Sequence, residues 1–416
     1  MRDLHRIGGD TMKILWLCNI VLPELCPVFG FRTPYAGGWL SGMWNELKKD
    51  SEYELAVCTP IKDEIYAKDG KYNGYKYYSF QWQGECEGQE VQISRFKEIL
   101  DEFNPDIIHI WGTEYIHTNS MIKACQNKGM IERVIVNIQG ILYKYTEKYT
   151  YGLREGYTDK ILESMQKRQK YEIESLKVIS NVSGRSEWDK ASVLQINSEL
   201  NYYHCGEILR ESFYNGMKWN YDSCEKYTIL ISQASYPIKG LHMVIKYLAE
   251  LKNRYPVLKV KVCGKSPLDE DNEYGHIISE LIVEYNMESV ISFIGAQSEQ
   301  DILEEYLNAN VFLSPSLIEN SSNSVCEALA LGVPVVSSRV GGMDSIIDNS
   351  NNGLMYDLGE EIKITDYISQ IFENKQLADK LSDNAIRSSK KLNGKQKCRD
   401  ELKLIYNTLY NAVSMK

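Results

Sequence analysis

Short apolar runs alternate with longer amphipathic stretches along most of the chain. Runs such as Asp106-Ile-Ile-His-Ile-Trp111 are almost continuously hydrophobic, which is typical of parallel strands buried on both faces of a sheet. The amphipathic stretches have the length and spacing of helices. This alternation predicts an α/β fold with doubly wound sheets. In the first half we expect strands at 13–20, 54–59, 75–80, 106–111, 134–138, 178–182 and 202–205, and helices at 38–49, 91–103 and 117–128.

The same rhythm restarts after about residue 222. Two blocks of this kind predict two Rossmann-like domains, residues 12–222 and 223–394, with the polar, aperiodic stretch 214–226 as the linker candidate. A last helical pattern follows the second sheet, so residues 395–416 are expected to pack back towards the N-terminal domain. The second block has strands expected at 228–232, 258–263, 290–294, 311–315, 335–338 and 354–356, and helices at about 240–253, 273–286, 298–308, 323–331 and 360–389.

Composition and charge exclude several classes of protein. Among 416 residues, 43% are hydrophobic and 25% charged, which is typical of a folded soluble protein. The net charge of −10 argues against a broad nucleic-acid-binding face. The ten cysteines form no paired motif, so neither a zinc site nor a disulfide framework is indicated. The apolar run 14–22 is too short to span a bilayer. We therefore expect a cytoplasmic protein. The Lys- and Tyr-rich stretches 143–151 and 160–177 leave peripheral contact with the membrane open, although solvated loops would explain them equally well.

One segment of the second domain combines carboxylates with the start of a helix. A buried strand ends near residue 315, and several capping residues follow where a helix begins. The free backbone N–H groups and the dipole of such a helix end attract phosphate. Carboxylates on either side of the same cleft suit sugar hydroxyls. An ordinary capped helix would also explain the pattern. The residues concerned are Glu319, Ser321, Ser322, Asn323 and Glu327.

This segment resembles a known signature. Glu319 and Glu327 are followed by Ala-Leu-Ala-Leu-Gly-Val-Pro-Val-Val and then by Val340-Gly341-Gly342, as in the family-4 retaining glycosyltransferases (glycosyl transferases group 1) with the GT-B fold. The similarity runs in register over residues 293–354. It implies an acceptor-side N-terminal domain and a nucleotide-sugar-binding C-terminal domain that face each other across a cleft. It also implies that Glu319 contacts the donor sugar, that Glu327 holds the ribose, and that the backbone between them receives the diphosphate.

A second candidate is Lys239, which starts a predicted helix after the strand 228–232. A cation there suits a diphosphate, although a lone lysine is more often solvated. In the family that the chain resembles, a Gly-Arg pair precedes this Lys-Gly pair and both cations grip phosphate. Gln233-Ala234 stands here instead. Lys265 and Arg185 are the candidate replacements.

A third candidate is the glycine pair Gly37-Gly38, in the loop after the first strand. Glycines allow a backbone to approach a phosphate closely, although such a pair is often only a loop marker. The resemblance implies a glycine-rich loop here that faces the phosphates and sugar of the donor.

Acceptor-side candidates follow two strands of the first domain. These are Glu114 and Gln139. Related enzymes often carry a histidine in each of these loops, but Trp111 and Gln139 occupy the corresponding places, so no catalytic histidine is assigned. His109 lies within an apolar run and is expected to be a core residue.

A divalent metal could be suggested by Asp269-Glu270-Asp271, but the hydrophilic surroundings favour a solvated loop. We therefore expect no metal site and no cofactor, because a helix dipole and cations can neutralise the leaving diphosphate. The resulting hypothesis is a metal-independent retaining hexosyltransferase that uses a nucleotide diphosphate sugar, with UDP as the expected nucleotide. The expected acceptor is a glycan or lipid-linked glycan of bacterial surface polysaccharide biosynthesis, such as lipopolysaccharide. The alternatives are a GT-B-fold nucleotide-sugar epimerase or hydrolase, and a non-catalytic nucleotide-sugar-binding subunit.

Overall fold

The chain forms two compact α/β units. The computed structural model describes residues 11–31, 38–61, 68–82, 88–269 and 272–415. Of these residues, the first unit takes those up to 143, those of 163–208 and those of 395–415, and the second unit takes those of 144–162 and 209–394. This division differs from the predicted boundary at residue 222. The segment from Leu209 onward packs into the second unit, where the Trp219 indole N–H donates to the Ala309 carbonyl at 2.7 Å.

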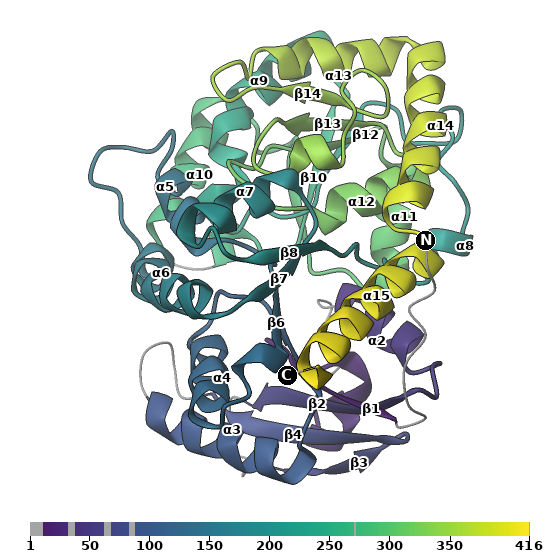
Figure 1. Ribbon diagram of the computed structural model, residues 1–416. Helices are drawn as coiled ribbons and strands as arrows, with labels where there is room; N and C mark the ends of the chain where they lie inside the picture. The colour runs from purple at the N-terminus through teal and green to yellow at the C-terminus, as the bar shows by residue number, and fades with distance from the viewer. Residues whose placement is uncertain (1–10, 32–37, 62–67, 83–87, 270–271, 416) are drawn as a thin grey trace. The chain divides into compact units, whose positions relative to one another are not determined.

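The first unit is built on an eight-stranded sheet in the order β3-β4-β2-β1-β5-β6-β7-β8 (Figure 1). All neighbours are parallel except β3, which runs antiparallel to β4. The order reverses between β1 and β5. The strands are β1 Met12–Leu17, β2 Tyr53–Ile61, β3 Gly70–Tyr72, β4 Tyr75–Gln81, β5 Ile107–Trp111, β6 Val134–Asn137, β7 Asn181–Gly184 and β8 Asn201–His204. The helices are α1 Cys26–Phe29, α2 Gly38–Leu47, α3 Gln89–Phe103, α4 Ile116–Asn127, α6 Lys160–Val178 (which begins in the second unit), α7 Glu187–Ile196 and α15 Lys395–Ser414.

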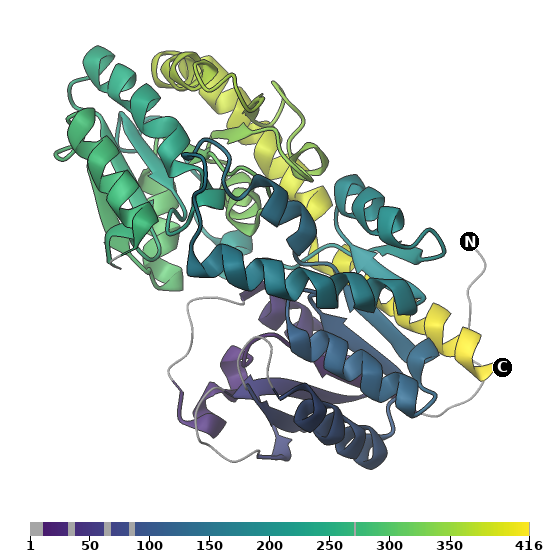
Figure 2. The ribbon, with the colours of Figure 1, turned by 90° about the vertical axis from the view of Figure 1, so that its left-hand side faces the viewer.

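Both faces of this sheet are covered. Leu15 and Leu17 of β1 belong to an apolar cluster that includes Phe96 of α3 and Met121 of α4, two helices that lie side by side (Figure 2). Because side chains alternate along a strand, Trp16 points to the opposite face. There its indole packs edge-on against Trp44 of α2, with ring centroids 5.0 Å apart. Two covered faces explain why the central strands are largely hydrophobic.

The second unit has a six-stranded parallel sheet in the order β11-β10-β9-β12-β13-β14. The order reverses between β9 and β12, and ligands of such sheets bind outside the carboxyl ends of the strands at this point. The strands are β9 Thr228–Ile231, β10 Lys259–Cys263, β11 Ile291–Gly295, β12 Val311–Ser314, β13 Val335–Ser338 and β14 Leu354–Tyr356. The helices are α5 Leu142–Lys148 (which begins in the first unit), α8 Ser212–Asn215, α9 Leu241–Arg254, α10 Glu273–Glu284, α11 Glu299–Asn308, α12 Asn323–Leu331, α13 Lys363–Glu373 and α14 Lys375–Leu392.

Two predicted elements are wrong in detail. Val178, predicted to begin a strand, ends α6, and the strand β7 starts at Asn181. The single helix predicted over 360–389 is two helices, because Asn374 ends α13 and its side chain caps α14 by accepting the N–H of Leu377. The other predicted strands are all present, and β3 was not expected. None of the helices in the described part of the chain is long and apolar enough to cross a bilayer.

Candidate active site

Lys239 and Glu319 meet at the point where the second sheet reverses its strand order. Lys239 lies in the short turn between β9 and α9, and Glu319 lies in the loop after β12. The Lys239 ammonium donates to Oε1 of Glu319 at 2.6 Å, and the Ser316 hydroxyl donates to the same oxygen at 2.9 Å. The structure therefore brings together the two residues predicted to be catalytic.

This pair is largely shielded from solvent. The side chains of Lys239 and Glu319 are 19% and 13% exposed. Burial alone would lower the pKa of Lys239, but the charge of Glu319, the nearby Tyr236 and the hydrogen bond to Glu319 raise it above its ordinary value. Lys239 is therefore a charged donor held at a fixed place before any ligand arrives.

Two glycines allow the backbone to pass close to the Glu319 loop on either side. Gly240 has φ +73°, and a Cβ on it would lie 1.9 Å from the carbonyl oxygen of Pro315. Gly341 has φ +54°, and a Cβ there would lie 1.9 Å from the carbonyl oxygen of Glu319. That oxygen accepts the N–H of Gly342 at 2.9 Å. The close backbone contacts thus explain why the Lys-Gly and Val-Gly-Gly motifs have glycine at these positions, in addition to any role in binding.

The helix α12 begins at Asn323, where the sequence predicts a phosphate-binding helix end. Ser322 is the N-cap, and Ser321 precedes it. The Ser322 hydroxyl does not cap the helix but lies 3.0 Å from that of Ser324, which accepts the Ser232 hydroxyl at 3.0 Å. Backbone N–H groups of a first turn have no partner within their own helix, and they lie at the positive end of its dipole. This helix end follows directly from the loop that carries Glu319.

Glu327 is buried in α12 and is bound by an arginine that was not predicted. Its Oε1 accepts Nε of Arg210 at 3.0 Å and Nη2 at 2.8 Å. Burial raises the pKa of Glu327, and Arg210 and Tyr306 offset part of this rise. Arg210 is 117 residues away in sequence and lies in the stretch assigned to the first domain, so no local pattern connected it with Glu327.

A polar cluster occupies the corresponding reversal point of the first sheet, between β1 and β5. Gly112 has φ +104°, and a Cβ there would lie 2.2 Å from Nδ2 of Asn19 and 2.4 Å from Oε2 of Glu114. The two side chains therefore both lie close to this glycine. Asn19 in turn lies 2.7 Å from Nε2 of His117 through its Oδ1. Glu114 was predicted, whereas Asn19 was not. Burial raises the pKa of Glu114, and Arg168 is among the groups that oppose this rise.

Gln139 and Arg185 bind the same buried carboxylate. Nε2 of Gln139 donates to Glu207 at 2.9 Å, and Arg185 forms an ion pair with Glu207 in which both side chains are under 10% exposed. This pairing within the first unit argues against Arg185 as the replacement phosphate cation. Lys265 follows β10 on the carboxyl edge of the second sheet, next to β9.

Other predicted residues fall in less informative places. Gly37 lies outside the described residues, and Gly38 is the first residue of α2. Glu270 and Asp271 also lie outside them, while the carboxylate of Asp269 accepts the N–H of Ser266 at 3.2 Å. The described residues contain no group of three His, Cys, Asp or Glu side chains that could hold a metal ion.

His109 is a core residue, as predicted. It is fully buried, its Nδ1 lies 2.7 Å from the hydroxyl of Tyr406, and burial lowers its pKa to about 3. It therefore remains neutral at physiological pH.

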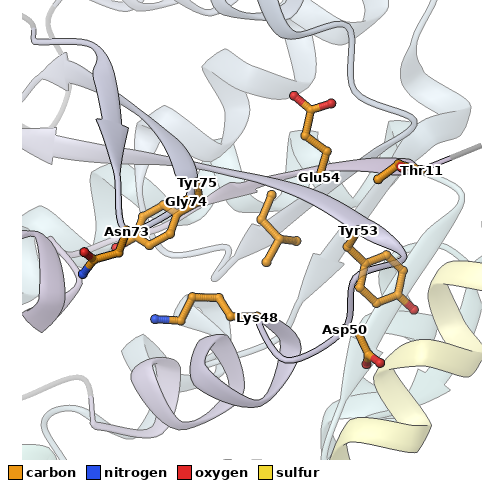
Figure 3. A pocket seen from close by; sticks show the side chains of 9 residues that line it. Thr11, Lys48, Asp50, Tyr53, Glu54, Asn73, Gly74 and Tyr75 are labelled. Atoms are coloured by element: carbon orange, nitrogen blue, oxygen red, sulfur yellow. The ribbon is translucent and has the colours of Figure 1, made fainter.

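A cavity of about 400 Å³ opens at the amino end of the first sheet (Figure 3). Its lining includes Lys48, Tyr53 and Tyr75, at the end of α2 and at the starts of β2 and β4. Ligands of parallel sheets bind at the opposite edge, so we do not count this cavity as part of the candidate site.

Residues 218–388, which carry Lys239, Glu319 and Glu327, match the family model of glycosyl transferases group 1. The match covers the part of the chain that forms the second sheet. Among curated relatives, a D-inositol 3-phosphate glycosyltransferase of Corynebacterium urealyticum is 27% identical over 139 residues, which is 33% of this chain and 32% of that protein. The chain spans about a third of the length of the first curated relatives it matches.

Solved structures of glycosyltransferases resemble nearly the whole chain. The sucrose-phosphate synthase of Thermosynechococcus elongatus superposes with a TM-score of 0.74 at 16% identity, covering 96% of this chain and 100% of that one. Anabaena HepE in complex with UDP-glucose superposes with a TM-score of 0.67 at 15% identity, covering 97% and 100%. At such identities the likeness concerns the fold, which is GT-B, as the sequence predicts.

Proposed function

We propose that the protein is a retaining glycosyltransferase that moves a hexose from a UDP-sugar to a glycan acceptor. The observation that carries this proposal is the Lys239–Glu319 pair, held at the strand-order reversal of a glycosyl transferases group 1 domain. A structural neighbour bound to UDP-glucose supports a UDP-linked donor.

In the proposed donor complex, the diphosphate lies against the first turn of α12 and Lys239. Both provide positive charge without a metal, through helix N–H groups and the ammonium. Glu327 accepts a ribose hydroxyl, and Glu319 accepts a hydroxyl of the sugar. Because Lys239 is already bound to Glu319, the diphosphate meets a donor that is charged and in place.

The proposed chemical step breaks the bond between the anomeric carbon and the diphosphate oxygen. The acceptor hydroxyl oxygen bonds to that carbon from the same face, so that its configuration is retained, and the hydroxyl proton passes to the departing phosphate oxygen. Negative charge grows on the diphosphate as the bond breaks, and a preorganised cation stabilises this charge most in the transition state.

On the acceptor side, we propose that Glu114 and Asn19 bind a sugar hydroxyl. A carboxylate beside an amide offers both an acceptor and a donor, which suits hydroxyl groups. Gln139, bound to Glu207, lies on the loop after β6 at the same edge of the sheet. We further propose a bacterial surface polysaccharide, lipid-linked in the membrane, as the acceptor. Action in the cytoplasm is consistent with the nine described cysteines, which are buried and unbridged.

The test is to incubate the protein with UDP-glucose and other UDP-hexoses and to measure UDP with and without oligosaccharide acceptors. UDP release that depends on an acceptor, with a glycosylated product, is expected. Free sugar without an acceptor would instead favour the hydrolase. A new nucleotide sugar without UDP would favour the epimerase, and binding without turnover would favour the non-catalytic nucleotide-sugar-binding subunit.

The same assay addresses metal. We propose that transfer persists in EDTA, because Lys239 and α12 supply the charge. Loss of activity on chelation and its return with Mn²⁺ or Mg²⁺ would show that a metal takes part.

A further inference from the structure

We propose that Arg210 is a positioning residue that decides which oxygen of Glu327 meets the ribose of the donor. The inference rests on the proposed function, because it assumes a nucleoside diphosphate at this site. It concerns a residue outside the segment that matches the group 1 family, which begins at residue 218.

The two hydrogen bonds of Arg210 both fall on one oxygen. Nε and Nη2 donate to Oε1 of Glu327 at 3.0 and 2.8 Å. Within the described chain, the contact of Oε2 is with the Tyr306 hydroxyl at 3.4 Å. That hydroxyl has a single proton and lies closer to the carbonyl of Ser324, at 2.9 Å. Oε2 therefore keeps its capacity to accept a further hydroxyl proton.

Arg210 is itself held in place by its surroundings. Its side chain is 16% exposed, and its guanidinium lies over the ring of Phe213, 4.8 Å from the centroid. Phe213 is fully buried, and the hydroxyl of the neighbouring Ser212 donates to Glu299 of α11 at 2.6 Å. A long side chain anchored in this way has little freedom to leave Glu327.

The charge of Arg210 also keeps Glu327 a good acceptor. A carboxyl group buried in α12 is driven towards its neutral form, which accepts hydroxyl protons less well. The guanidinium opposes this effect and holds Oε1 in place through two charge-assisted hydrogen bonds. Lysine would keep the charge but not the two-pronged geometry.

The experiment compares UDP with 2′,3′-dideoxy-UDP by calorimetric titration of the full chain. In the unmodified protein we expect UDP to bind about tenfold to a hundredfold more tightly, as for a hydrogen bond to a charged group. Arg210→Gln should weaken UDP binding and bring the ratio of the two affinities close to one, with little change for dideoxy-UDP. For Arg210→Lys, the ratio of the two affinities should lie between that of the unmodified protein and that of Arg210→Gln. For Glu327→Gln, the ratio should also fall close to one. The control is Arg254→Gln, because Arg254 lies in the same unit with a side chain that is 50% exposed.

Each other outcome has a definite meaning. If Arg210→Gln weakens both nucleotides equally, Arg210 binds the diphosphate and the inference is wrong. It is also wrong if the ratio is unchanged in both Arg210 variants, or if the unmodified protein binds UDP without preferring it to dideoxy-UDP. Failure of the unmodified protein to bind any nucleoside diphosphate would contradict the proposed function itself. Melting temperatures identify a variant that fails to fold, and Arg210→Lys then carries the comparison.

Discussion

Lys239 forms an ion pair with Glu319 and is proposed to bind the diphosphate of the donor as well. At rest its ammonium is bound to Glu319 at 2.6 Å. In the donor complex the diphosphate would share this cation with the carboxylate. Lys239, Arg210, Glu319 and Glu327 form two cation–carboxylate pairs whose charges sum to zero. In the proposed transfer, the α12 dipole and the fixed position of Lys239 would therefore stabilise the extra negative charge on the diphosphate.

We predict that Lys239→Ala lowers kcat by about a hundredfold or more, which is the scale for removing one preorganised donor. The effect on KM should be smaller, because the charge on the leaving group is greatest in the transition state. Steady-state kinetics with a UDP-sugar measure both. Lys246→Ala is the control, since Lys246 is exposed on α9, the helix that follows Lys239. A near-normal kcat for Lys239→Ala would mean that another cation has this role, and Lys265 would be the next residue to test.

The sequence predicts part of the site because that part is local. Lys239-Gly240 and the Glu319–Glu327 spacing each lie within one short segment, so motif and spacing identify them. Arg210 and Asn19 are different. Arg210 bonds to Glu327, whereas Asn19 bonds to His117 and lies near Glu114, and only the folded chain brings these residues together. A contact between residues more than ninety positions apart leaves no periodic signal in one sequence.

At the level of elements, the Glu319 loop depends on the turn before α9. Gly240 lies at φ +73° with the carbonyl oxygen of Pro315 occupying the place of a Cβ. Gly295 has the same φ but nothing within 4 Å of that place. Comparing substitutions at the two positions therefore separates the energetic cost of backbone strain from that of steric conflict.

We predict that Gly240→Ala lowers the free energy of unfolding by about 1–3 kcal/mol more than Gly295→Ala does, the usual cost of forcing atoms into a filled space. Both variants should also share the strain of a positive φ. Urea denaturation measures the difference. Equal losses in the two variants would mean that the Pro315 loop yields easily.

The helix α6 supplies a carboxylate that holds two loops of the first unit. Glu172 is fully buried, and its Oε1 accepts the Thr113 hydroxyl at 2.6 Å and the Leu142 N–H at 3.1 Å. Its Oε2 accepts the Tyr143 N–H at 3.3 Å. These contacts join the loop after β5, which carries Glu114, to the start of α5. Burial raises the pKa of Glu172 to about 7.

We predict that Glu172 makes stability fall as pH rises. Between the ordinary pKa of 4.5 and about 7, the folded protein keeps a proton on Glu172 that the unfolded chain has released. Its contribution to the free energy of unfolding therefore decreases over this window and is constant above it. Denaturation at pH 5, 6, 7 and 8 should show the unmodified protein losing stability relative to Glu172→Gln. Glu174→Gln, two positions away with a side chain that is 52% exposed, should track the unmodified protein. A constant difference between the unmodified protein and Glu172→Gln would refute the shift.

The predicted elements were confirmed where a strand is buried on both faces of its sheet. The strands β5 and β12 are buried along their whole length, and all but one residue of each is apolar, so their pattern is unambiguous. The strand β3, Gly70–Tyr72, is short, antiparallel and not buried, and it offers no apolar run to detect. Asn374 broke the predicted long helix because its side chain caps α14, a role that competes with continuing α13. Short polar elements thus depend on contacts that a single sequence does not display.

At the scale of the whole molecule, the last helix of the chain, α15, belongs to the same unit as the first strand, β1, and bonds to it. The Tyr406 hydroxyl of α15 accepts the Trp16 indole N–H of β1 at 2.8 Å and lies 2.7 Å from Nδ1 of His109 in β5. All three side chains are fully buried. The second unit, by contrast, contains both ion pairs of the candidate site, Lys239–Glu319 and Arg210–Glu327. Stability of the first unit and nucleotide binding by the second should therefore be separable.

We predict that Tyr406→Phe destabilises the protein without changing UDP affinity. The substitution leaves the indole N–H of Trp16 buried without its partner, which costs about 1–3 kcal/mol. For units of this size, a loss of that order lowers the melting temperature by several degrees. Glu327→Gln should do the reverse, weakening UDP binding while leaving the α15 contacts intact. Thr408→Ala is the control on the same helix, because the Thr408 hydroxyl bonds only to a carbonyl of its own helix among the described contacts. Differential scanning calorimetry and UDP titration of the three variants measure both properties. If Tyr406→Phe weakened UDP binding as strongly as Glu327→Gln does, the two units would be coupled, and the nucleotide site would depend on residues of both.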